Sequence, residues 1–134
     1  MALVAGTILL VACSKSSSNP TQKSIEGTGT WNIETILAVQ ANPLSGIIDT
    51  VLYSSLPPAN AWKNGSVNFE SNDTVYWTIV PFNEDTTMRY RVLNSQTFVQ
   101  GLDTMHIQTL TDSLFIFYEQ EGGYKATFTL IPAN

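Results

Sequence analysis

Apolar and polar residues alternate with a period of two along most of the chain after residue 30. The clearest alternating apolar positions are Val67 and Phe69, then Val75, Trp77 and Ile79, then Met88, Tyr90 and Val92, then Met105 and Ile107, and finally Ala126, Phe128 and Leu130. Such alternation is typical of strands that bury one face. Turn residues such as Ser71-Asn72-Asp73 and Gly122-Gly123 separate the runs. The pattern therefore predicts an all-β fold, an antiparallel meander of about eight short strands that closes into a barrel, with a β-sandwich as the alternative.

One segment, Ser45 to Ser54, does not fit this alternation cleanly. Its residues Ile47, Ile48, Val51 and Leu52 also suit the three- and four-residue spacings of a helix. Prolines lie on both sides of it. We therefore expect either a strand or a short helix within a long connection.

The first 29 residues differ in kind from the rest, because all 14 aromatic residues lie at or after Trp31. Residues 1–12 contain no charge, and they are too few for a membrane-spanning helix of about 20 residues. Their length suits the hydrophobic region of a signal peptide. Residues 14–29 are polar, with Ile25 as the one bulky aliphatic residue, which predicts a flexible tether. We expect a signal peptide over 1–12, a modified cysteine and tether over 13–26, and a β domain over 27–134.

The four residues Leu10-Val11-Ala12-Cys13 resemble the signal of bacterial lipoproteins. This resemblance implies that a diacylglycerol is attached to the Cys13 thiol and that the chain is cut before Cys13. Two or more acyl chains give a stable anchor without a transmembrane helix. Such signals normally begin with a positive charge, and none lies between Met1 and Ala12, so a natural start upstream of Met1 stays open.

The residues after the cysteine bear on which membrane holds the anchor. Ser14 follows Cys13, where an aspartate commonly marks inner-membrane retention in Gram-negative lipoproteins, and the first acidic residue is Glu26. Surface-exported lipoproteins of the Bacteroidota often carry acidic residues directly after the cysteine. The resemblance therefore implies a lipid anchor on the periplasmic side of the outer membrane, with the cell surface as the alternative.

Gly29-Thr30-Trp31, at the start of the first predicted strand, matches the Gly-x-Trp signature of lipocalins. The region that follows resembles a small bacterial lipocalin-like domain. In that family the glycine allows a turn under the barrel and the tryptophan closes its base. A barrel of about eight strands either fills its interior with side chains or leaves a cavity for one small apolar ligand. The walls of such a cavity are expected to include the side chains of Trp77, Tyr90, Phe98, Met105 and Tyr118.

Composition and motifs argue against catalysis. The net charge is −5 and no Lys/Arg cluster occurs, so the chain lacks the electrostatic signature of a nucleic-acid-binding protein. No phosphate loop, nucleophile elbow or paired-histidine zinc motif is present. Asp103 and the single histidine, His106, are three residues apart and should point to opposite faces of a strand. We expect no enzyme activity, no metal and no cofactor.

Two functional hypotheses follow. The first is a lipid-anchored binding protein whose barrel holds a small apolar ligand. The second is a non-catalytic envelope scaffold with a filled barrel, which contacts a protein partner through the apolar connection from Leu44 to Trp62. The alternative for this connection is that its apolar side chains cap the open end of the barrel. A filled interior favours the second hypothesis over the first.

Overall fold

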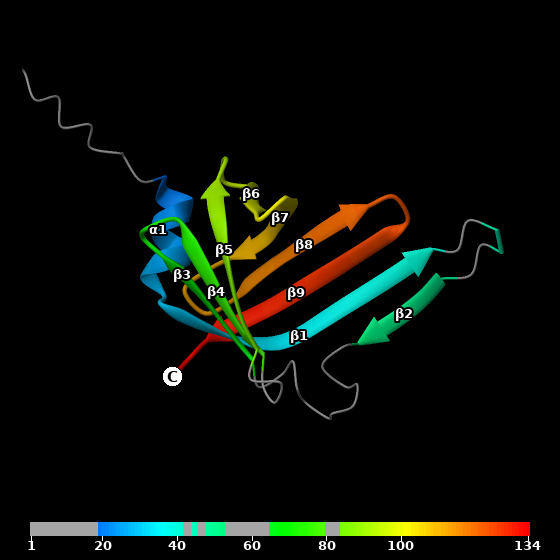
Figure 1. The fold of residues 1–134 in the computed structure, drawn as a ribbon, viewed down its shortest axis with the longest axis horizontal. Coiled ribbons are helices and arrows are strands. Elements are labelled where there is room, and N and C mark those ends of the chain that lie inside the picture. The colour runs from blue at the N-terminus through cyan, green and yellow to red at the C-terminus, as the bar shows by residue number, and fades with distance from the viewer. Residues whose placement is uncertain (1–18, 42–43, 46–47, 53–64, 80–83) are drawn as a thin grey trace, which may run out of the picture.

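The computed structural model describes residues 19–41, 44–45, 48–52, 65–79 and 84–134. Over these residues one short helix precedes a set of antiparallel strands (Figure 1). The elements are α1 (Pro20–Gly27), β1 (Thr30–Ala41), β2 (Ile48–Leu52), β3 (Ser66–Glu70), β4 (Thr74–Ile79), β5 (Glu84–Val92), β6 (Thr97–Gln100), β7 (Asp103–Leu110), β8 (Phe115–Glu121) and β9 (Tyr124–Pro132).

Eight of the strands form a closed antiparallel barrel. Strands β3 to β9 pair in chain order, and β1 pairs with β3 on one edge and with β9 on the other. Because β1 closes the ring, each barrel strand has a neighbouring strand on both sides, which is the usual benefit of closure. The prediction of an all-β meander that closes into a barrel is confirmed, and the sandwich alternative is wrong.

Strand β1 is longer than its barrel partner β3 and continues beyond it. Its first residues, Thr30 to Asn32, pair with β3, and its last residues, Leu37 to Ala41, pair with β2. In Figure 1 this half of β1 extends to the right together with the β8–β9 hairpin, and β2 lies along its outer edge. The ambiguous segment Ser45 to Ser54 therefore contains a strand, Ile48–Leu52.

The alternation in the sequence places one set of side chains inside the barrel. In β1 the buried positions are Trp31, Ile33, Ile36 and Ala38. The step of three between Ile33 and Ile36 is a β-bulge, because the register against β9 shifts between Ile33 and Thr35. One extra residue in a strand restores the inward face after a local bend, as expected for a bulge.

Residues with left-handed backbone form three of the tight turns. Gly101 and Gly122 have φ of 62° and 55°, and they lie in the β6–β7 and β8–β9 turns at the same end of the barrel. Asp73, with φ of 63°, ends the β3–β4 turn at the opposite end, where its N–H bonds to the Glu70 carbonyl at 3.1 Å. Glycine and aspartate suit such positions because they tolerate positive φ better than most residues do.

Part of the predicted tether is wrong. Residues Pro20–Gly27 form helix α1, and the Ile25 side chain is 0% exposed. Asn19 caps the helix by accepting a hydrogen bond from the Thr21 N–H at 3.0 Å, and Pro20 occupies the first turn, where it needs no N–H partner. This polar segment has little apolar surface to bury, and the packing of Ile25 into the barrel stabilises the helix instead. Residues 13–18 of the tether, Cys13 included, lie outside the described residues, as does the signal-peptide segment 1–12.

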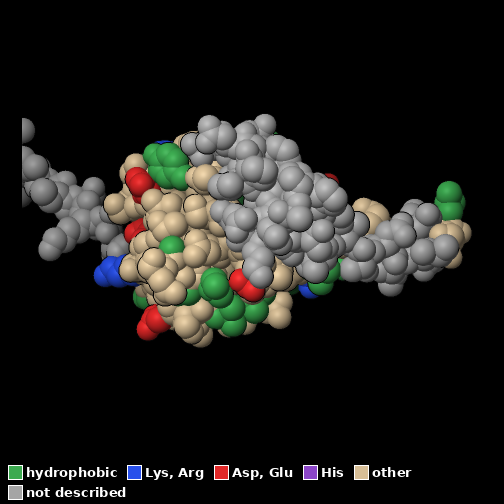
Figure 2. Space-filling model, turned by 90° about the horizontal axis from the view of Figure 1, so that it is seen from below, with side chains coloured by type: hydrophobic (Ala, Val, Ile, Leu, Met, Phe, Trp, Pro, Cys, Tyr) green, Lys and Arg blue, Asp and Glu red, His purple; other side chains and the backbone are tan. Residues whose placement is uncertain are grey.

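The described part of the chain contains no helix that is long and apolar enough to cross a membrane. On the face seen in Figure 2, the described surface is mainly uncharged polar side chains and backbone, with several groups of hydrophobic side chains and few acidic or basic ones. This agrees with the low content of charged residues, 13% of the chain.

Candidate functional site

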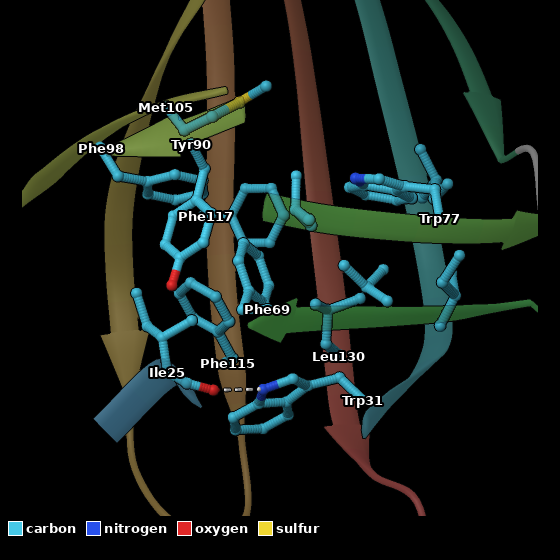
Figure 3. Packing of buried hydrophobic residues seen from close by; sticks show 14 residues of the cluster. Ile25, Trp31, Phe69, Trp77, Tyr90, Phe98, Met105, Phe115, Phe117 and Leu130 are labelled. Atoms are coloured by element: carbon cyan, nitrogen blue, oxygen red, sulfur yellow. Dashed lines mark hydrogen bonds between the residues drawn. The ribbon is translucent and has the colours of Figure 1, made fainter. Parts of the chain in front are cut away.

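The half of the barrel next to α1 is filled by aromatic side chains (Figure 3). Phe115 lies at the centre of this cluster, with its ring centroid 4.8 Å from that of Phe117 and 5.6 Å from that of Trp31. Phe69 and Phe98 also contact it, at 5.9 and 6.0 Å. All four contacts are tilted, and none is the face-to-face sandwich that aromatic rings disfavour. This half of the interior is therefore a packed core.

Helix α1 closes the base of the barrel through Trp31. The Trp31 side chain is fully buried, and its indole N–H donates to the Ile25 carbonyl at 3.1 Å. Gly29 joins the helix to β1 with φ of 77°, and its N–H bonds to the Glu26 carbonyl at 3.0 Å. No described atom lies within 4 Å of the position that a Cβ would take at Gly29. The glycine is therefore required for its backbone conformation and not for a close approach.

Tyr90 connects the aromatic core to the helix. Its ring is buried against Phe69, and its hydroxyl points toward α1 (Figure 3). The hydroxyl donates to the Glu26 carboxylate and lies 3.1 Å from the Glu70 carbonyl. Burial raises the pKa of Tyr90 strongly, and the hydrogen bond and negative charge of Glu26 add to this effect. Tyr90 therefore stays protonated and keeps its role as a donor.

The opposite end of the barrel contains a hollow of about 200 Å³. Strands β4 to β9 contribute its lining. Four apolar side chains contribute, Trp77, Met88, Met105 and Phe128, together with the polar side chains of Thr86, Gln100, Asp103 and Glu119. The hollow lies directly against the packed core, because Phe128 in its wall stacks on Phe117 at a ring-centroid distance of 5.0 Å. We refer to this space as the open-end hollow.

Trp77 and Gln100 fix the floor of the open-end hollow. Each is only 6% exposed, and the Trp77 indole N–H donates to Gln100 Oε1 at 3.1 Å. The Trp77 ring also makes an edge-on contact with Phe128, at a centroid distance of 5.6 Å. The indole and the amide are therefore held in one orientation by hydrogen bonding and by packing.

Acidic side chains line the rim of the open-end hollow. Glu119 projects to the same face as Met105, its partner in the β7–β8 register, and Asp103 pairs with Gln100 across the β6–β7 turn. Burial raises the pKa of Glu119, and the negative charges of Asp103 and Glu121 raise it further. Lys125, on the adjacent strand β9, lies on the outer face, with Nζ 4.0 Å from the centroid of the Tyr118 ring. The rim thus concentrates negative charge.

The five residues predicted to line a cavity fall into three places. Trp77 and Met105 line the open-end hollow. Tyr90 and Phe98 are inside the barrel but do not line the hollow, since their rings pack against Phe69 in the aromatic core. Tyr118 was expected to point inward, and that is wrong: it lies on the outer face, stacked on His106 at 5.1 Å. Phe117 takes the inward position, and adjacent strand residues point to opposite faces.

His106 and Asp103 do not converge on one side of the barrel wall. His106 is half-buried on the outer face, whereas Asp103 is exposed at the rim of the open-end hollow. A broader depression of about 520 Å³ covers the rim, and both residues border it together with Glu119, Glu121 and other residues. Within the described ranges, no group of three or more His, Cys, Asp or Glu side chains is arranged to hold a metal ion.

Several lining residues were missed from the sequence. Met88 and Phe128 are in the alternating runs that predict strands, so their inward direction could have been read there. The inward direction of Gln100 and Glu119 could not be read in this way, because inward positions are identified by apolar residues and these two are polar. The signal available for Glu119 was its spacing of two from Phe117.

The class that the fold and this site define is a small closed antiparallel β-barrel with a buried aromatic core and one hollow end. The chain matches no protein-family model, and no curated protein is significantly similar to it in sequence.

Proposed function

We propose that the protein is a non-catalytic, lipid-anchored binding protein of the bacterial envelope, and that its barrel holds a small ligand with an apolar body at the open end. The observation that carries this proposal is the open-end hollow, which combines the apolar walls of Trp77, Met88, Met105 and Phe128 with a few oriented polar groups. Ligand sites commonly have this composition. The Gly29–Trp31 pair at the base and the eight-stranded meander support a relationship to lipocalins.

The size of the open-end hollow limits the ligand. Pockets for drug-sized molecules are roughly 300–1,000 Å³, whereas a cavity of about 150 Å³ holds a benzene ring. At about 200 Å³, the hollow suits one ring or a short branched chain. The aromatic core below it leaves no room for a long acyl chain to enter the described interior.

The binding proposal is tested by native mass spectrometry of the protein extracted gently from membranes. A co-purifying ligand that is lost from a hollow-filling variant at the half-buried wall, Met88→Trp, supports it. The matched control is Leu102→Trp, which adds the same side chain at an exposed turn position at the same end of the barrel. Ligand-free protein in every preparation would contradict the proposal.

The anchor requires a separate experiment, because Cys13 lies outside the described residues. The Leu10–Cys13 resemblance supports a diacylglycerol on the thiol and cleavage before it. A Cys13→Ser protein is then expected in the soluble fraction with its N-terminal segment retained. Protease treatment of intact cells distinguishes the periplasmic side of the outer membrane, which we propose, from the cell surface. A Cys13→Ser protein that remains in membranes would contradict lipid attachment.

The packed aromatic core favours a second candidate, an envelope scaffold that acts through protein contacts. Leu44 and Leu102, in two connections at the open end, are 97% and 99% exposed. Most of the proposed contact segment, Leu44 to Trp62, lies outside the described residues, with β2 and residues 44–45 as its described parts. Crosslinking in cells that captures one defined envelope protein, and loses it in a Leu44→Ser/Leu102→Ser variant but not in Leu93→Ser, would support the scaffold.

A further inference from the structure

One polar side chain of the open-end hollow, Gln100, is only 6% exposed, and a hydrogen bond to one of its two amide atoms turns the other toward the hollow. Gln100 Oε1 accepts from the Trp77 indole N–H, which can only donate, so the orientation of the amide is fixed and Nε2 points the other way. Among the described residues, no acceptor bonds to Nε2. Every described side-chain nitrogen or oxygen that is sealed from solvent has a partner, so this unpartnered Nε2 must reach the space of the hollow.

Whereas Gln100 Nε2 needs an acceptor, the carboxylates at the rim of the open-end hollow need a donor or a cation. Glu119 is half-buried, and Asp103 and Glu121 are close enough to raise its pKa further. A carboxylate in such surroundings is stabilised by a cation or by a strong donor. The described residues provide none on this face, because Lys125 is held over Tyr118 on the outside.

Apolar walls separate these two polar requirements. The ring of Trp77 and the side chains of Met88, Met105 and Phe128 surround a space of about 200 Å³ between the Gln100 amide and the acidic rim. A complementary molecule therefore needs three parts: a compact apolar body, an acceptor near that body for Gln100, and a positive charge at the rim.

We propose that the open-end hollow binds small aromatic amino alcohols, with the ring among Trp77, Met88, Met105 and Phe128, the hydroxyl oxygen accepting from Gln100 Nε2, and the ammonium group beside Asp103 and Glu119. This inference rests on the proposed binding function and specifies its ligand class. A cation in contact with aromatic rings and carboxylates gains from both.

Four probes of nearly equal size separate the parts of this inference. They are 2-amino-1-phenylethanol as the full match, 1-phenylethane-1,2-diol as its neutral isostere, mandelate as an anion, and 2-phenylethylamine, which lacks the acceptor. The readout is NMR titration of the assigned tryptophan indole N–H signals. Trp77 lies in the hollow, and Trp31 lies at the opposite end, so Trp31 serves as an internal control in every titration.

We expect 2-amino-1-phenylethanol to shift the Trp77 signal and to leave the Trp31 signal unchanged. Its Kd should be in the millimolar range or below, as suits about ten non-hydrogen atoms. The diol should bind about five- to tenfold more weakly, because it lacks a charge-assisted hydrogen bond at a partly exposed site. The amine without the hydroxyl should bind about threefold more weakly, and mandelate should not bind.

A matched pair of variants identifies the carboxylate. Glu119→Gln should remove most of the preference for the amine over the diol, whereas Asp112→Asn, which removes one charge beside α1, should leave it unchanged. Equal binding of the amine and the diol would overturn the amine inference while supporting a small-ligand site. A Trp77 signal that no probe shifts would overturn both the inference and a binding role for the hollow.

Discussion

The two ends of this barrel are built from the same strands and have opposite characters. At the closed end, each polar group in contact with the core has a partner: the Trp31 N–H bonds to α1, and the Tyr90 hydroxyl bonds to Glu26. At the open end, the inward side chains of the same strands leave a hollow, an amide nitrogen of Gln100 that bonds to no described acceptor, and a Glu119 carboxyl whose pKa is raised by burial and neighbouring charge. The contrast separates the part of the interior that stabilises the fold from the part that is available for a ligand.

Helix α1 accounts for much of this difference. It inserts Ile25 into the base, and Gln22 holds Glu26 with a bond of 2.8 Å and reaches Asp73 of the β3–β4 turn at 3.1 Å. No described element plays that part at the other end. Variants at matched positions in the two halves therefore test the comparison directly.

Removal of a core ring should have the largest effect. Phe115→Ala deletes a fully buried side chain that contacts Trp31, Phe69, Phe98 and Phe117, and we expect a loss of about 3–5 kcal/mol in the free energy of unfolding. Met88→Ala, in the half-buried wall of the hollow, should cost about 1 kcal/mol. Urea unfolding measures both. Equal losses would contradict a division into a packed half and a hollow half.

The contribution of α1 gives the next effect. Ile25→Ala removes the side chain that plugs the base, and we expect a loss of about 2–4 kcal/mol. The matched control is Lys23→Ala, an exposed position of the same helix, which should change stability by less than about 0.5 kcal/mol. If Ile25→Ala is also neutral in urea unfolding, α1 is a tether and not a plug.

A single hydroxyl at the closed end should have a smaller effect. Tyr90→Phe keeps the ring contact with Phe69 and loses the donor to Glu26, which should cost about 1–3 kcal/mol at pH 7. Because the pKa of Tyr90 is raised in the folded protein, its stabilisation is present below the ordinary tyrosine pKa of 10.0 and is lost as the pH rises above it. The difference between wild type and variant should therefore shrink in alkaline solution. A difference in thermal unfolding that is constant with pH would contradict this role.

The barrel itself could be predicted from the sequence because period-two alternation depends on local residue order. Even the bulge in β1 is visible, as the step of three from Ile33 to Ile36. Helix α1 could not be predicted in the same way, since its composition is that of a linker. The one informative residue was Ile25, the bulky aliphatic side chain in that segment, and it is the residue that α1 buries.

The candidate site was harder to predict than the fold. The inward directions of Trp77 and Met105 follow from alternation. The direction predicted for Tyr118 is wrong because the odd-numbered residues of β8, Phe115 and Phe117, point inward, and Tyr118 therefore points outward. The extent of the filled region depends on contacts across the barrel, such as that between Phe69 and Phe98 at 6.0 Å. Strand order and register determine those contacts, and alternation within one strand carries no information about them.

The smallest expected effect is a gain in stability, and it comes from a substitution at the open end. Glu119→Gln removes a charge that burial and two neighbouring carboxylates disfavour, so the variant should be more stable than wild type by up to about 1 kcal/mol at pH 7–8. Since the pKa of Glu119 is raised in the fold, the charge costs nothing below the ordinary pKa of 4.5 and costs most once the pH exceeds the raised value. Thermal unfolding at several pH values should therefore show a gain that disappears on acidification. Asp112→Asn, at an exposed position beside α1 and away from the hollow, is the control for charge removal alone. A loss of stability in Glu119→Gln at pH 8 would mean that the carboxylate is satisfied in the protein, and that the open end resembles the closed end more closely than its geometry indicates.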